Sequence, residues 1–256
     1  MRVVGNGECL ALCVSGGMIR NSVCPYCRKL MVKAENQENS RSVEHLIPNA
    51  ALTRKRKNDE GDFYACRKCN SRKSHIDYVL GTVAKCQMDN SETAADSLIK
   101  AVKKDDVASK RFIKMIQSHR EQVDGVHMTL PIKGEELVEY IEFLGKGQYF
   151  KKHKIPYNPN TQVFNIRFGN KAFIQSFQES YRDKHGTNCF RDLEQNERTE
   201  VINGGECLIY QKNKGYMFVF HDYTVITIKV LRKNRKNILR CNDKTEKLIS
   251  DFNKYT

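Results

Sequence analysis

Apolar positions follow two different periods along this chain, and each predicts a different kind of element. After a cysteine-rich segment, the apolar positions recur at helical spacing, which predicts a helix from Arg67 onward. Two short stretches before it, Ser42–Leu46 and the aromatic Phe63–Ala65, are predicted to be strands. The first strand should end by Pro48, because proline cannot donate to a ladder. The predicted order is therefore strand, loop, strand and helix, with the helical stripe at Ile76, Val79, Leu80 and Val83.

Residues 88–125 are predicted to form one or two helices. A charged interruption at 103–106 separates two apolar stripes at helical spacing. A glycine- and proline-containing stretch at 125–131 is typical of a linker, and it places a domain boundary there. The predicted units are a finger at 1–87, a helical segment at 88–125 and an α+β domain at 126–256. The first stripe is Ala95, Leu98, Ile99 and Val102, and the second is Phe112, Ile113 and Ile116.

The last half mixes both periods, so the fold class is α+β. A helix at 135–144 is expected to stop at Gly145 and Gly147. A strand at 161–168 and a helix through Phe173, Phe177 and Tyr181 follow. Three further alternating stretches with turn residues between them predict an antiparallel meander at 207–210, 216–220 and 224–230.

The charge balance favours a polyanionic partner. The 256 residues include 44 Lys and Arg against 30 Asp and Glu, a net charge of +14 that both halves of the chain share. Basic side chains set against phosphates release condensed counterions, so a nucleic acid is the expected partner. The longest apolar runs are too short to cross a bilayer, and the first residues lack the order of a secretory signal. We expect a cytoplasmic protein with no membrane partner.

Four of the ten cysteines form two Cys-x-x-Cys pairs, Cys24 with Cys27 and Cys66 with Cys69. Each such turn can present two thiolates to one ion, so the spacing favours tetrahedral Zn²⁺ as a structural cofactor. Without a secretory signal or a thioredoxin-like context, a disulfide or redox role is the weaker interpretation. The remaining six cysteines are expected to be small buried hydrophobic residues.

Between and beside these pairs lie Glu44-His45 and Asn70, which have the chemistry for phosphodiester hydrolysis. Histidine can activate a water, while carboxylate and amide oxygens suit Mg²⁺ or another divalent cation. Neighbouring residues of a strand point to opposite faces, so Glu44 and His45 can converge only where the strand ends or twists.

Taken together, Cys24-x2-Cys27, Glu44-His45-x2-Pro48 and Cys66-x2-Cys69-Asn70-x2-Lys73 resemble an HNH endonuclease with a ββα-metal finger. The resemblance covers about 50 residues. It implies that His45 is the general base, that Glu44 and Asn70 hold the catalytic divalent cation, and that the four cysteines hold structural zinc. By analogy alone, it also suggests a setting such as restriction or phage defence.

Basic residues near this motif are candidates for contact with DNA. Lys73 lies one turn after Asn70 and could contact a phosphate, the alternative being a solvated lysine. A basic tetrad between the two strands could follow the phosphate backbone, the alternative being a solvated loop. The tetrad consists of Arg54, Lys55, Arg56 and Lys57.

The chain departs from the family pattern at the middle asparagine, which tethers the loop between the strands. Asn58 comes early and Asp62 is a carboxylate, although either could make the tethering bond. Two further hypotheses remain open: a non-catalytic zinc module that binds nucleic acid, and a purely structural zinc clip in a protein scaffold. Residues 126–256 match no motif and are a candidate substrate-recognition domain.

Overall fold

The computed structural model describes residues 17–86, 91–103, 107–122, 125–127, 131–169, 171–222 and 224–254. It confirms the mixed α+β class, with a two-stranded finger near the N-terminus and a five-stranded antiparallel sheet in the second half. No helix within these ranges is long and apolar enough to span a membrane.

The finger has the predicted order of strand, loop, strand and helix. Strand β1 (Arg41–Glu44) pairs antiparallel with β2 (Phe63–Cys66), and helix α1 (Arg67–Cys86) follows β2 directly. The loop between the strands contains two short 3-10 turns, η1 (Asn49–Ala51) and η2 (Asn58–Glu60). Strand β1 ends at Glu44, two residues before the end predicted at Leu46, so His45 lies just beyond the strand.

The middle segment has two helices, α2 (Ser91–Lys103) and α3 (Val107–Gln117). Part of the predicted linker is instead paired. Strand β3 (Arg120–Gln122) forms an antiparallel hairpin with β4 (Gly125–His127). Residues 128–130 of that linker lie outside the described residues.

Helix α4 (Gly134–His153) corrects one prediction, because it runs straight through Gly145 and Gly147. These glycines make room for close packing and do not end the helix. A Cβ on Gly145 would meet Phe164 and Ile228 of the sheet, and one on Gly147 would meet Leu46 of the finger. The helix ends at His153, and the residue after it, Lys154, adopts a left-handed conformation with φ 58°.

The predicted meander is confirmed and forms the centre of a larger sheet with the strand order β5-β9-β8-β7-β6. The two edge strands pair with it antiparallel. The strands are β5 (Gln162–Gly169), β6 (Thr199–Ile202), β7 (Cys207–Lys212), β8 (Gly215–Phe220) and β9 (Thr224–Arg232). The accompanying helices are α5 (Lys171–His185), α6 (Cys189–Glu194) and α7 (Arg235–Asn253).

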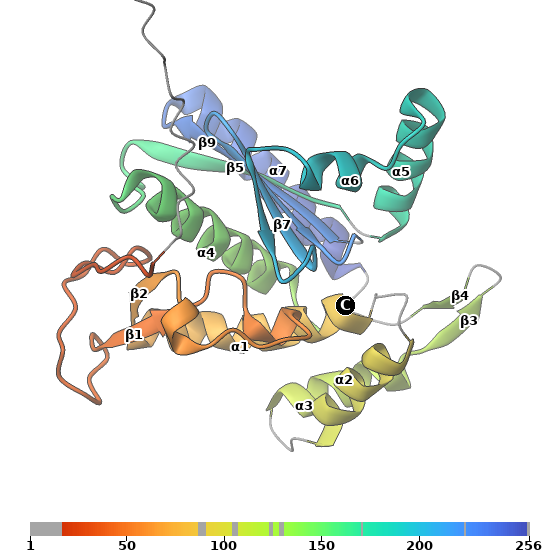
Figure 1. The fold of residues 1–256 in the computed structure, drawn as a ribbon, viewed down its shortest axis with the longest axis horizontal. Coiled ribbons are helices and arrows are strands. Elements are labelled where there is room, and N and C mark those ends of the chain that lie inside the picture. The colour runs from red at the N-terminus through yellow and green to blue at the C-terminus, as the bar shows by residue number, and fades with distance from the viewer. Residues whose placement is uncertain are drawn as a thin grey trace, which may run out of the picture.

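Helix α4 lies between the finger and one face of the sheet, as Figure 1 shows. One hydrophobic core runs through all three layers, including Phe63 of the finger, Leu144 of α4 and Ile226 of the sheet. The core therefore joins residues on both sides of the boundary predicted at 125–126. A smaller cluster lies on the opposite face of the sheet, where Val219 packs near Ile174 and Phe190 of α5 and α6.

Candidate functional site

The four cysteines of the two predicted pairs come together at one end of the finger. The first pair lies on a tight turn, in which the backbone carbonyl of Cys24 accepts a hydrogen bond from the Arg28 N–H at 2.9 Å. The second pair spans the end of β2 and the first turn of α1. Their four Sγ atoms lie within 4.8 Å of one another, and the Sγ atoms of Cys27 and Cys66 are 3.6 Å apart. Such a cluster could hold a metal ion such as zinc.

The thiols of this cluster differ in acidity. A hydrogen bond with the Cys69 side chain lowers the pKa of Cys24 to about 5 against the opposing effect of burial, and the Cys66 N–H lies 3.4 Å from the Cys24 sulfur. Burial raises the pKa of Cys66 to about 11. Cys24 is therefore better prepared than Cys66 to act as a thiolate, the form that binds a metal ion.

Glu44, at the end of β1, lies in a buried cluster of charges. Its side chain is 1% exposed, and its Oε1 is 2.9 Å from the Nζ of Lys73, which is fully buried. The same ammonium lies 2.8 Å from Oδ2 of Asp77, one turn further along α1. The prediction that Lys73 faces a phosphate, and its alternative of a solvated lysine, are both wrong, because α1 turns this position inward against β1.

The charges of this cluster do not balance. Two carboxylates surround one ammonium, and burial raises the pKa of Glu44 and brings that of Asp77 to about 7. Burial alone would lower the pKa of Lys73, but the two carboxylates raise it. Lys73 therefore remains charged, and the raised pKa values of the two carboxyl groups favour uptake of a proton by the cluster.

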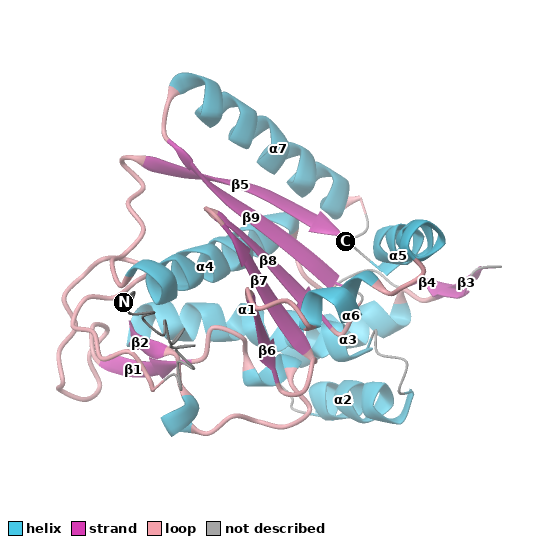
Figure 2. Cartoon of the chain, turned by 45° about the horizontal axis from the view of Figure 1, so that its top comes forward, coloured by secondary structure: helices cyan, strands magenta, loops and turns pink. Residues whose placement is uncertain are grey.

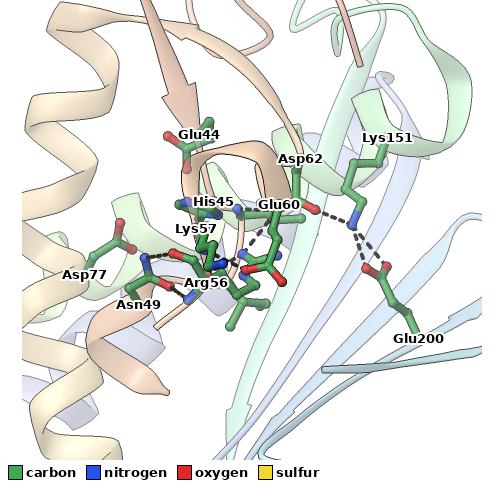
Figure 3. Close-up of polar contacts among 12 residues, drawn as sticks. Glu44, His45, Asn49, Arg56, Lys57, Glu60, Asp62, Asp77, Lys151 and Glu200 are labelled. Carbon is green, nitrogen blue, oxygen red and sulfur yellow. Dashed lines mark hydrogen bonds and ion pairs between the residues drawn. The ribbon is translucent and has the colours of Figure 1, made fainter. Parts of the chain in front are cut away.

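His45 lies where the strand ends, which is the condition under which its side chain and that of Glu44 can face one site. Because β1 ends at Glu44, the next side chain is released from strict alternation, and Figure 3 shows the two residues at the end of the strand. Neither ring nitrogen of His45 reaches solvent or finds a hydrogen-bond partner among the described residues. Burial and the nearby Arg56 guanidinium lower the pKa of His45, so its imidazole is neutral near pH 7.

Asn70 joins the helix to the first strand. Its Nδ2 donates to Ser42 Oγ at 2.6 Å and to the Val43 carbonyl at 3.0 Å. These two bonds fix the plane of the amide in the first turn of α1. Within the described part of the chain the amide oxygen accepts no hydrogen bond, so it is available to another partner.

Asp62 makes the tether that the family pattern assigns to an asparagine. Its Oδ2 accepts from the Leu46 N–H at 2.7 Å and lies 3.3 Å from the Arg56 guanidinium (Figure 3). Asn49 adds a tether that the sequence did not predict, because its amide bonds both the N–H and the carbonyl of Arg56. The only local signal was an asparagine directly after Pro48, a position typical of a turn.

The basic tetrad divides between surface and interior. Arg54, Lys55 and Lys57 are exposed, as contact with a phosphate backbone requires. Arg56 is not available for this role, because its side chain is 13% exposed and donates to the Ile47 carbonyl at 2.7 Å. Its ion pair with Asp62 supports the loop around His45.

A chain of polar contacts anchors the finger to the rest of the molecule. The Lys151 ammonium of α4 lies 2.8 Å from both Asp62 and Glu200 of β6, as Figure 3 shows. At the other end of the loop, His221 Nε2 lies 2.6 Å from the Ala51 carbonyl. These contacts join residues that are 49 to 170 positions apart in the sequence, so local sequence patterns do not reveal them.

No protein-family model, curated protein or solved structure matches this chain.

Proposed function

We propose that the chain is a zinc-stapled, metal-dependent endonuclease of the HNH type that hydrolyses phosphodiester bonds in nucleic acid, with DNA as the favoured substrate. The observation that carries the proposal is the placement of His45. A neutral imidazole that makes no hydrogen bond with another described residue lies directly after the strand end that carries a buried carboxylate, inside a ββα finger.

The four-cysteine cluster fits zinc. A tetrahedral ion with Zn–S bonds of about 2.3 Å requires sulfurs roughly 3.8 Å apart. The 3.6 Å separation between Cys27 and Cys66 matches this spacing closely. The metal would hold the turn that precedes β1 to the start of α1, and so fix the finger in which His45 and Asn70 lie.

Glu44 and Asn70 are the residues that would hold the catalytic divalent cation. Their carboxylate and amide oxygens are hard ligands of the kind that Mg²⁺ prefers. Lys73 Nζ lies 2.9 Å from Glu44 Oε1, so a divalent cation would have to share this carboxylate with the ammonium. When bound, such a cation would neutralise the charge that grows on the scissile phosphate.

In the proposed reaction His45 removes a proton from the attacking water through one of its ring nitrogens. Its lowered pKa keeps the ring in the basic form at neutral pH, and Arg56 beside it disfavours the protonated form. Asp62 and Asn49 hold the loop on which His45 lies. The finger therefore fixes the base on its backbone, while neither ring nitrogen is held in a hydrogen bond with another described residue.

A second candidate is a non-catalytic zinc module that binds nucleic acid. The specific observation in its favour is the burial of Glu44, which is 1% exposed and already paired with Lys73. In this alternative the ammonium takes the place of the divalent cation permanently, and the finger is a structural relative of a nuclease.

Cleavage assays on matched histidine variants test the proposal. We expect the wild-type chain to cut plasmid or single-stranded DNA in Mg²⁺ or Mn²⁺, and His45→Ala to lose this activity by about 100-fold or more. His75→Ala is the control, because His75 is exposed on the same helix as Asn70. If the wild-type chain and His45→Ala both bind DNA and leave it intact, the enzyme proposal fails and the binding module is supported.

A further inference from the structure

The face of the sheet turned away from the finger carries two rows of side chains across four strands. In one row Asn165 pairs with Lys229, which pairs with Gly215, which in turn pairs with Lys212. Strands are about 4.8 Å apart, so this row is about 14 Å wide. The next row on the same face lies about 7 Å away and contains Arg167, Thr227, Met217 and Tyr210.

This face is covered at one end and open at the other. Beyond the second row, Leu208, Val219 and Val225 are buried beneath α5 and α6. The two rows lie outside this covered end, apart from Met217, which packs against the buried cluster. Together with Arg240 of α7 they line a groove of about 390 Å³. Figure 2 shows α7 along the β5 edge of the sheet, whereas α6 contacts β6 and β7 towards the opposite edge.

The cations of this groove have no side-chain partner among the residues that the structure describes. Arg167, Lys212, Lys229 and Arg240 are all exposed. None of the four makes a hydrogen bond or an ion pair with another described residue, and no acidic side chain lines the groove. A cleft on the other side of the sheet is different, since its Arg56 and Lys151 are both paired with Asp62.

A further cation extends the groove along α7. Lys244 lies one turn after Arg240, and desolvation together with the guanidinium groups of Arg167 and Arg240 lowers its pKa. Like charges held this close repel one another, and a bound anion would relieve that repulsion. Lys244 therefore adds a further cation beside a groove that no acidic side chain lines.

The middle of the groove offers space and an aromatic wall. A Cβ on Gly215 would have only backbone atoms within 4 Å, which leaves the sheet open between Lys229 and Lys212. Half-buried Tyr210 lies in the neighbouring row. Cationic rows with a gap and an aromatic ring suit a phosphate backbone that runs across the strands with a base lying against the sheet.

We propose that this open face binds a single-stranded segment of nucleic acid through its phosphates. The proposal relies on the proposed function only for the choice of nucleic acid among polyanions. A sheet face favours a single strand, because the grooves of a duplex are read by helices or ribbons that insert into them. The site lies across the sheet from His45, so it would anchor the nucleic acid at a distance from the finger.

Salt-dependent binding tests this assignment. The probe is a fluorescent oligothymidylate, titrated without added divalent cation at several salt concentrations. We expect the double variant Arg167→Gln/Lys229→Gln to bind about tenfold more weakly and to lower the salt slope by about 1.4, which corresponds to two lost phosphate contacts. The matched control is Lys110→Gln/Lys114→Gln, two exposed cations one turn apart on α3.

Three results would overturn the proposal. One is equal loss of affinity in the two double variants, and another is no loss in either. The third is tighter binding of a duplex of the same length, which would assign the face to double-stranded DNA. An unchanged melting temperature for both variants excludes unfolding as the cause. Binding is measured without divalent cation and cleavage is measured with Mg²⁺ or Mn²⁺, so failure of the nuclease proposal remains distinguishable from failure of this one.

Discussion

Lys73 in the finger and Lys229 on the sheet are both lysines, but their surroundings are opposite. Lys73 is fully buried and lies within 2.9 Å of two carboxylates. Lys229 is exposed in a groove without acidic residues. The difference teaches that a net charge of +14 does not describe what is available to a partner. Some of the charge is used inside the fold, and some is left for an external anion.

The two regions also place different demands on the fold. A buried ammonium is costly unless carboxylates compensate it, so Glu44, Lys73 and Asp77 depend on one another. An exposed cation stays hydrated and costs the fold little. Changes in the finger should therefore alter stability, whereas changes on the sheet face should alter binding.

The largest expected effect comes from the cysteine cluster, which holds the buried region together. Cys66→Ser removes one of four ligands, and we expect loss of the metal and unfolding of the finger. Metal binding contributes on the order of 10 kcal/mol in zinc-finger peptides, so the remaining core cannot compensate. Atomic spectroscopy for zinc and far-UV circular dichroism measure the two consequences.

Cys189→Ser provides the control, because Cys189 lies on α6 outside the cluster. It should keep one zinc per chain and the wild-type spectrum. A Cys66→Ser protein that retains both would show that the cluster is not a metal site.

The second-largest expected effect tests the difference between Lys73 and Lys229 directly. Lys73→Met should lower the free energy of unfolding by about 3–5 kcal/mol, because it leaves Glu44 and Asp77 buried without their cation. Lys229→Met should change it by no more than about 0.5 kcal/mol. Urea denaturation of both variants at pH 7 measures the difference.

Added Mn²⁺ sharpens this test. If Glu44 can hold a divalent cation, Mn²⁺ should restore part of the stability of Lys73→Met and have no such effect on Lys229→Met. Equal stability of the two lysine variants in the absence of metal would contradict the difference that we draw between these regions.

The smallest predicted effect is a pH dependence of the contact between the finger and the sheet. Burial alone would raise the pKa of Asp62, but Lys151 and Arg56 outweigh it and hold the pKa below the ordinary value of 3.8. The associated stability is fully present above pH 3.8 and is lost as the pH falls through the lower pKa of the folded state. Each unit of lowering contributes about 1.4 kcal/mol.

Melting temperatures between pH 5 and pH 2.5 check this prediction when wild type is compared with Asp62→Asn. The wild type should lose more stability across this range than the variant, which has no carboxylate to titrate at this position. Parallel curves would show that Asp62 does not contribute.

Local patterns predicted the finger well, because its chemistry depends on short spacings. Cysteine pairs two residues apart, a proline after the first strand and an apolar stripe after the second pair are features of neighbouring residues. The meander was predictable for the same reason, since its turns join consecutive strands. Gly145 and Gly147 misled the prediction, because the reason for a glycine in a helix can lie in the residues packed against it.

The sequence by itself determined the α+β class, the four clustered cysteines, the strand-loop-strand-helix order of the finger and the central meander, all of which depend on short-range periodicity. Tertiary structure alone decided that Lys73 is buried, that Asp62 is the tether and that Arg167 and Lys229 share an open face. The physical reason is that burial and ion pairing depend on which distant segments pack together. The sequence presents Lys73 and Lys229 as equal charges. The packing of α1 against β1 buries Lys73, whereas Lys229 stays exposed on the face of the sheet.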